Sequence, residues 1–105
     1  MKKQKEDAGF RRFIESHKSV LTGQSPTICC HVRRVKFGSG TAIKPDYYAC
    51  PMTKPEHDYQ HQHGELATLI KYRPQQHWTL ETAKEFFENA AIHYKDKWFE
   101  GLLMS

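Results

Sequence analysis

The segment formed by residues 28–65 constrains the fold most, because its hydrophobic pattern changes twice along its length. Residues 28–35 alternate in polarity and predict a strand, and residues 47–50 predict a second short strand. A glycine-containing turn lies between them, so the two strands are expected to pair antiparallel. Pro51 is expected to end the second strand, and a helix is predicted over residues 54–69, with Gly64 weakening its middle.

Helical patterns flank this segment on both sides. Asp7 can cap a helix over residues 8–18, whose apolar face would carry Phe10, Phe13, Ile14 and His17. A longer helix is predicted over residues 79–99, with an apolar stripe of Ala83, Phe87, Ala90, Tyr94 and Trp98. Residues 1–6 are polar and basic and are expected to be flexible. A chain of 105 residues with this order of elements is expected to form one α+β domain.

Composition narrows the classes of protein to consider. Sixteen Lys and Arg against twelve Asp and Glu give a formal charge of +4, which is compatible with nucleic-acid binding but also with a solvated basic surface. The three cysteines, Cys29, Cys30 and Cys50, form no C-x-x-C pair and suggest a reducing cytosol. No apolar run approaches the ~20 residues of a membrane span, and the N-terminus lacks the apolar region of a signal peptide. We therefore expect a cytoplasmic protein without a membrane partner.

Histidines are the candidate functional residues. His57 and His61 lie four residues apart in a predicted helix, which places both imidazoles on one face, whereas His63 cannot share that face. With seven histidines, chance gives roughly 0.4 pairs at this spacing, so solvent-facing histidines fit it as well. His31 lies in the first predicted strand and is followed by basic residues able to contact phosphates or to form a solvated strand edge: Arg33, Arg34, Lys36 and Lys44.

These features occur in the order of a known nuclease fold. A strand histidine, a hairpin with glycines and basic residues, and a helix with H-x-x-x-H resemble the HNH, or ββα-metal, nucleases. The chain is most similar to small phage and prophage HNH-type domains of unknown function that are related to phage recombination-enhancement nucleases. The matching stretches within residues 10–99 are His31-Val-Arg33, Gly38-Ser-Gly-Thr41, Lys44-Pro-Asp-Tyr47, Pro51-Met52, His57-Asp58, His61-Gln-His-Gly-Glu65 and the helix from Phe86 to Trp98.

The resemblance implies a ββα unit over residues 28–70 and a metal-dependent endonuclease or nickase that acts on DNA in the bacterial cytosol. One divalent ion, Mg²⁺, Mn²⁺ or Zn²⁺, would be bound by His57 and His61. His31 would be the general base, and Asp46 would orient His31 or assist at the ion. The basic residues after His31 would contact the DNA backbone.

The chain departs from this group at a second metal site. Members typically hold a structural zinc through C-x-x-C before the first strand and C-x-x-H at the start of the helix. The matching positions here are Ser19, Thr22, Thr53 and Glu56, so the structural zinc is predicted to be absent. Thr53 and Glu56 instead have the spacing of a capping box, which would hold the helix start by hydrogen bonds.

Two alternatives remain open from the sequence. Cys30 precedes His31 at a position where many HNH motifs carry a metal ligand, but strand alternation places Cys30 on the opposite face from His31 and favours it as a core residue. Cys29 and Cys50 are interpreted as small buried hydrophobic residues. The main functional alternative is a catalytically degenerate HNH-fold phage protein that binds nucleic acid, or a host or phage protein, without cleavage.

Overall fold

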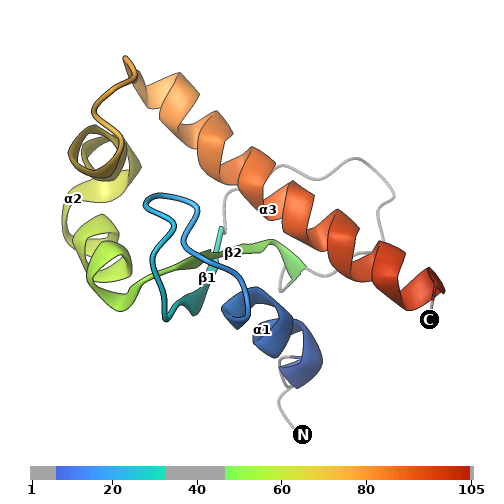
Figure 1. Cartoon of the computed structure of the whole chain (residues 1–105). Coiled ribbons are helices and arrows are strands. Elements are labelled where there is room, and N and C mark those ends of the chain that lie inside the picture. The colour runs from blue at the N-terminus through green and yellow to red at the C-terminus, as the bar shows by residue number, and fades with distance from the viewer. Residues whose placement is uncertain (1–6, 33–46, 105) are drawn as a thin grey trace, which may run out of the picture.

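The computed structural model describes residues 7–32 and 47–104, and these form a small α+β fold (Figure 1). In the described part, three helices surround one two-stranded antiparallel sheet. Their order is α1 (Ala8–Glu15), β1 (Ile28–His31), β2 (Ala49–Met52), α2 (Lys54–Tyr72) and α3 (Leu80–Met104). The predicted order of elements and the antiparallel pairing are therefore confirmed. The predictions for the glycine-containing turn, Arg33, Arg34, Lys36, Lys44 and Asp46 lie outside the described residues.

The sheet pairs β1 with β2 so that Cys30 lies opposite Cys50 and Cys29 lies opposite Pro51. The expectation that Pro51 ends the second strand is wrong, since β2 runs from Ala49 to Met52. The pairing explains how a proline is accommodated. Just beyond β1, the amide of Val32 donates to the carbonyl of Tyr48 at 2.8 Å, and bonded and non-bonded pairs alternate along an antiparallel ladder. Pro51 therefore falls at a non-bonded position, where no ladder N–H is required, and its carbonyl accepts from the Val20 amide instead (3.1 Å).

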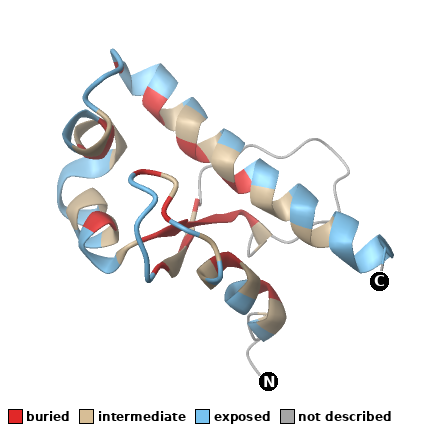
Figure 2. Ribbon diagram, viewed as in Figure 1, coloured by how far each residue is buried: buried red, intermediate tan, exposed pale blue. Residues whose placement is uncertain are grey.

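Helix α3 contributes Ala83, Phe87 and Ala91 to the buried core. It packs on β2 and on α2, and its buried residues lie on the side that faces the sheet (Figure 2). The predicted stripe is confirmed for Ala83 and Phe87, which are buried, and for Ala90, Tyr94 and Trp98, which are partly buried. Helix α1 contributes a second cluster in which Phe10 and Ile14 pack beside Ala49 of β2. Both clusters lie against β2, all four of whose residues are buried.

Local hydrogen bonds explain where α1 begins and ends. Asp7 is its N-cap, as predicted, because a carboxylate oxygen of Asp7 accepts from the amides of Gly9 (2.9 Å) and Phe10 (3.1 Å). The other oxygen accepts from the Tyr47 hydroxyl at 2.7 Å, and this hydrogen bond is the main cause that lowers the pKa of Asp7. The helix ends at Glu15 rather than at residue 18, and the Ser16 hydroxyl donates to the Phe13 carbonyl at 2.6 Å.

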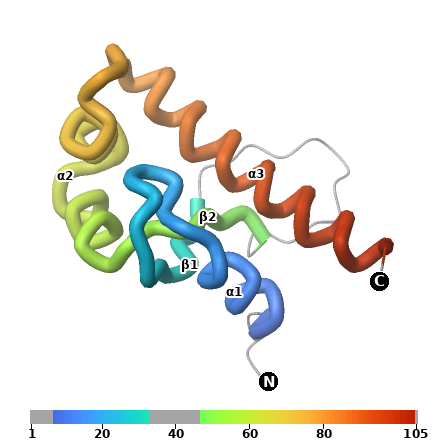
Figure 3. Tube along the Cα trace, in the orientation of Figure 1, coloured from blue at the N-terminus to red at the C-terminus, as the bar shows by residue number. Residues whose placement is uncertain are grey.

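Helices α2 and α3 extend beyond their predicted ends. Helix α2 continues to Tyr72. Pro74 disfavours a helical conformation for Arg73, the residue before it. Helix α3 continues through Gly101 to Met104. Gly64 interrupts α2 with φ 91° and ψ 171°, so the helix consists of two halves with different directions, as Figure 3 shows. No helix among the described residues is both long and apolar enough to cross a membrane.

Candidate metal centre

A buried carboxylate holds the first turn of α2. Glu56 is only 2% exposed, and its side chain accepts hydrogen bonds from the hydroxyls of Ser19 (2.6 Å) and Thr22 (2.5 Å). It also accepts from the backbone amide of Thr53 at 3.0 Å, and the Thr53 hydroxyl accepts from the Glu56 amide. The predicted capping box is therefore confirmed. Because both carboxylate oxygens are hydrogen-bonded, the charge can be buried without a metal or a cationic partner.

These contacts bring four positions together that are distant in the sequence. Ser19 and Thr22 lie 37 and 34 residues before Glu56, yet all three side chains and Thr53 meet in one hydrogen-bonded cluster, called the Glu56 cluster below. The sequence indicated only the contact between Thr53 and Glu56 from local spacing. The position of His57, the next residue in the chain, is thereby fixed relative to the loop before β1.

The two helix histidines face each other, as their spacing predicted. The Nε2 atoms of His57 and His61 are 3.1 Å apart, and the rings are nearly perpendicular with centroids 4.3 Å apart. Two imidazole nitrogens bound to one ion at 2.0–2.1 Å, with an angle between about 90° and 109°, would be about 2.8–3.4 Å apart, so the observed 3.1 Å suits a shared ion. A hydrogen bond between one protonated and one unprotonated nitrogen has the same length.

The surroundings of His57 keep its imidazole neutral. Burial lowers the pKa of His57 below its usual value of 6.5, and the neighbouring His61 lowers the pKa further. The Nδ1 atom of His57 is buried and has no hydrogen-bond partner among the described residues. A neutral imidazole is the form that binds a metal ion. The His57 side chain is therefore ready to bind a cation at pH 7 without first losing a proton.

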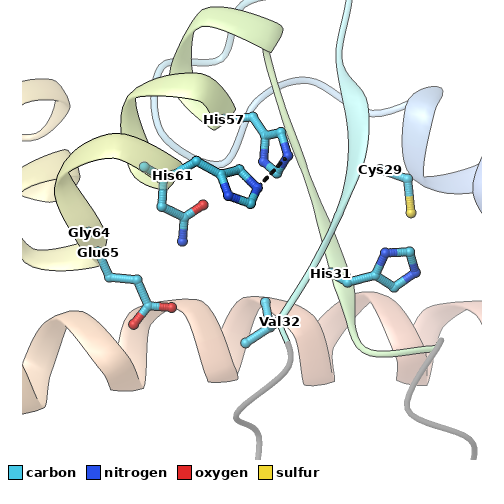
Figure 4. A pocket seen from close by; sticks show the side chains of 8 residues that line it. Cys29, His31, Val32, His57, His61, Gly64 and Glu65 are labelled. Atoms are coloured by element: carbon cyan, nitrogen blue, oxygen red, sulfur yellow. Dashed lines mark hydrogen bonds between the residues drawn. The ribbon is translucent and has the colours of Figure 1, made fainter.

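A cavity of about 410 Å³ brings the strand histidine to this pair. Strand β1 and the residue after it contribute Cys29, His31 and Val32, and α2 contributes His57, Gln60, His61, Gly64 and Glu65. Figure 4 shows the rings of His57 and His61 turned toward one another, whereas the ring of His31 points away from that pair, toward the side of Cys29. All three predicted histidines thus line one cavity, with His31 separate from the pair.

The cavity also contains residues that the sequence did not indicate as functional. Gln60 lies one turn before the kink at Gly64 and Glu65 directly follows it, and both line the cavity from α2. Cys29 also lines the cavity, and the prediction that it is buried is confirmed in part, because it is half-buried and packs against the cluster of Phe10 and Ile14. Helical spacing was the available signal, since Gln60, Gly64 and Glu65 lie near the face of His57 and His61.

Cys30 and Cys50 belong to the core, as alternation predicted. Cys30 is 2% exposed, its thiol donates to the Ile28 carbonyl, and burial raises its pKa to about 12. Burial likewise raises the pKa of the Cys50 thiol. Within residues 7–32 and 47–104, no group of three His, Cys, Asp or Glu side chains that could hold a metal ion is found.

Comparisons with family models, with curated proteins and with solved structures find no match to this chain. The chemistry of the site therefore has to be argued from its own residues.

Proposed function

We propose that this chain is a metal-dependent endonuclease or nickase of the HNH type, which hydrolyses phosphodiester bonds in DNA. The observation that carries the proposal is the cavity lined by a strand histidine, His31, and by His57 and His61 on one helix face. The two-stranded sheet followed by α2 supports a ββα unit. We place the protein in the cytosol of a bacterium that carries the phage or prophage.

The proposal assigns separate roles to the two sides of the cavity. His57 and His61 would hold one divalent ion, Mg²⁺, Mn²⁺ or Zn²⁺. When bound, this ion supplies positive charge that stabilises the negative charge of the transition state. His31 accepts a proton from the attacking water as the new oxygen–phosphorus bond forms and the bond to the 3′ oxygen breaks. His31 has to stay off the ion to act as a base, and the arrangement in Figure 4 suits this requirement.

The remaining predicted residues complete the proposal. Asp46 orients His31 or assists at the ion. The DNA backbone is bound by the basic residues after His31, namely Arg33, Arg34, Lys36 and Lys44. Contacts of this kind carry no sequence code and weaken steeply as salt increases.

The second candidate is a degenerate HNH-fold protein that binds nucleic acid, or a host or phage protein, without cleavage. One observation favours it: His57 and His61 can satisfy each other through a hydrogen bond of 3.1 Å. The histidine pair could in that case be a structural contact between two turns of α2.

A plasmid-nicking assay separates the two candidates. The wild type, His31→Ala and His57→Ala are compared in Mg²⁺, Mn²⁺, Zn²⁺ or EDTA, with His77→Ala as the matched control, because His77 is exposed and lies in the loop before α3. We expect metal-dependent nicking that falls about 10²- to 10⁴-fold in His31→Ala and at least as far in His57→Ala, with no change in His77→Ala. Folded protein that shifts DNA in a gel but does not nick it in the presence of any of these metals would support the non-cleaving alternative.

A further inference from the structure

Glu65 lines the same cavity as the histidine pair. In a continuous helix, residues 57, 61 and 65 would follow one another along a convex surface. The break at Gly64 changes the direction of α2 immediately before Glu65, so the second half of the helix begins at the edge of the cavity. Figure 4 shows Glu65 on α2 below the rings of His57 and His61, with its carboxylate directed toward Val32.

A cation between His57 and His61 needs negative charge nearby. Both ligands are neutral imidazoles, so they leave the full double charge of a divalent ion uncompensated. Glu65 is the carboxylate among the residues that line the cavity. In the described part of the chain, no group of three such side chains that could hold one ion is found. A carboxylate that lines the cavity without binding the ion directly can still accept hydrogen bonds from water molecules on the ion.

We propose that Glu65 is a water-mediated ligand of the metal centre and determines which ion it selects. The inference rests on the proposed function, because it requires an ion at His57 and His61. Mg²⁺ and Mn²⁺ favour oxygen ligands, and Mg²⁺ in particular keeps several water molecules when it binds a protein. Two imidazoles alone favour Zn²⁺ instead. Glu65 therefore shifts the preference of the centre from Zn²⁺ toward hydrated, oxygen-seeking ions.

A purely structural role for Glu65 makes a different prediction. Glu65 is the first residue of the second half of α2, and a carboxylate there interacts favourably with the helix dipole. Glu81 is the matched control, because it is an exposed carboxylate in the first turn of α3 and does not line the cavity. If helix stabilisation were the only role, Glu65→Gln and Glu81→Gln would both lower the melting temperature slightly and neither would alter ion binding.

The test is a calorimetric titration of the full chain with Mn²⁺ and separately with Zn²⁺, without DNA. We expect Glu65→Gln to weaken Mn²⁺ binding by about 10- to 100-fold, as loss of a supporting carboxylate typically does, and Zn²⁺ binding by much less. Glu81→Gln should bind both ions like the wild type. Glu65→Asp keeps the negative charge on a side chain that is one methylene shorter, and it should weaken Mn²⁺ binding less than Glu65→Gln does.

The outcomes distinguish failure of this inference from failure of the proposed function. If His57→Ala abolishes Mn²⁺ binding while Glu65→Gln leaves it unchanged, the metal centre stands and the role of Glu65 is wrong. If the wild type binds neither ion, both proposals fail. If Glu65→Gln does not fold, as judged by circular dichroism, the Glu65→Asp variant decides the question, and Mn²⁺ affinity equal to that of the wild type would overturn the inference.

Discussion

Glu56 and His57 are neighbours in the chain, yet they lie in opposite environments. Glu56 is almost fully buried, and its carboxylate is hydrogen-bonded to Ser19, Thr22 and the Thr53 amide. His57 is half-buried, lines a cavity, and has a buried Nδ1 without a hydrogen-bond partner among the described residues. Because successive helix residues are rotated by about 100°, one turn of α2 can present both environments.

The difference separates a structural polar group from a candidate functional one. A buried polar group contributes to stability when its hydrogen bonds are made, as they are for Glu56. An incompletely bonded imidazole at a cavity contributes less to folding and remains available to a ligand. We therefore expect substitutions in the Glu56 cluster to change mainly stability, and substitutions of the cavity residues to change mainly ion binding and cleavage.

The largest expected effect is the conversion of the Glu56 cluster into a zinc site. The proposed relationship to HNH nucleases places four zinc-ligand positions at Ser19, Thr22, Thr53 and Glu56, and their side chains meet in one cluster. The quadruple variant with Ser19→Cys, Thr22→Cys, Thr53→Cys and Glu56→His should bind one Zn²⁺ with an apparent binding free energy on the order of 10 kcal/mol. The measurement is calorimetric titration, together with the absorption spectrum of the Co²⁺ form.

A control isolates the effect of the fourth ligand. The triple variant that keeps Glu56 should bind Zn²⁺ much more weakly, because a buried carboxylate held by a backbone amide is poorly placed to coordinate. A quadruple variant that folds but takes up no Zn²⁺ would count against the proposed relationship, without any bearing on whether the histidine cavity binds an ion.

The second effect concerns the stability that the Glu56 cluster provides. Glu56→Ala removes three hydrogen bonds to a charged acceptor and leaves the O–H of the buried Ser19 without the acceptor to which it donates. We expect the free energy of unfolding to fall by about 2–4 kcal/mol, measured by urea denaturation. The exposed Glu85→Ala is the control and should change the free energy of unfolding by about 0.5 kcal/mol or less. A loss below about 1 kcal/mol for Glu56→Ala would show that the cluster is not a major source of stability.

The sequence predicted the elements of this molecule better than it predicted their contacts. Periodicity located α1 and α3, because the burial of Phe10, Ile14 and Phe87 follows the helical repeat. The capping box at Thr53 and Glu56 could be recognised because its partners are three residues apart. Ser19 and Thr22 could not be assigned to the same cluster from local spacing, since their contacts with Glu56 span more than thirty residues.

The strand residues likewise show that contacts between segments distant in the sequence could not be predicted from local spacing. The place of Pro51 within β2 depends on which cross-strand pairs are hydrogen-bonded, and that register is a property of two strands together. Cys29 was assigned to the core as a small apolar residue, but it lies on the strand face of His31, which borders the cavity. The histidine pair was predictable from spacing, whereas the contribution of Glu65 depends on the conformation of Gly64.

The third prediction concerns the kink at Gly64, a residue that lines the cavity. Gly64 has φ 91° and ψ 171°, a region that is essentially restricted to glycine. A Cβ added there would meet no atom within 4 Å, so the cost of Gly64→Ala is conformational rather than steric. We expect a loss of about 1–3 kcal/mol in the free energy of unfolding and weaker Mn²⁺ binding, because Glu65 follows the kink directly.

Gly101→Ala is the matched control for this substitution. Gly101 lies within α3, has space for a Cβ, and has no positive φ, so alanine should be neutral or slightly stabilising there. Thermal denaturation and Mn²⁺ titration of both variants would check the prediction. A Gly64→Ala variant as stable as the wild type would indicate that α2 can straighten without a loss of stability. The kink at Gly64 would then not be required to form the cavity.

The smallest effect is electrostatic and concerns His57 alone. Burial is the main cause of its lowered pKa, with the charge of His61 next, so we expect His57 to titrate below 6.5 in an NMR pH titration. His61→Ala should move the pKa of His57 upward but leave it below 6.5, since burial remains.

Because the unfolded chain binds the proton more tightly than the folded one, His57 should reduce stability as pH falls through 6.5 and have no effect well above it. His57→Ala should remove that part of the pH dependence, whereas His77→Ala should not. A His57 pKa at or above 6.5 would mean that the imidazole is solvated, and the contrast with Glu56 would disappear.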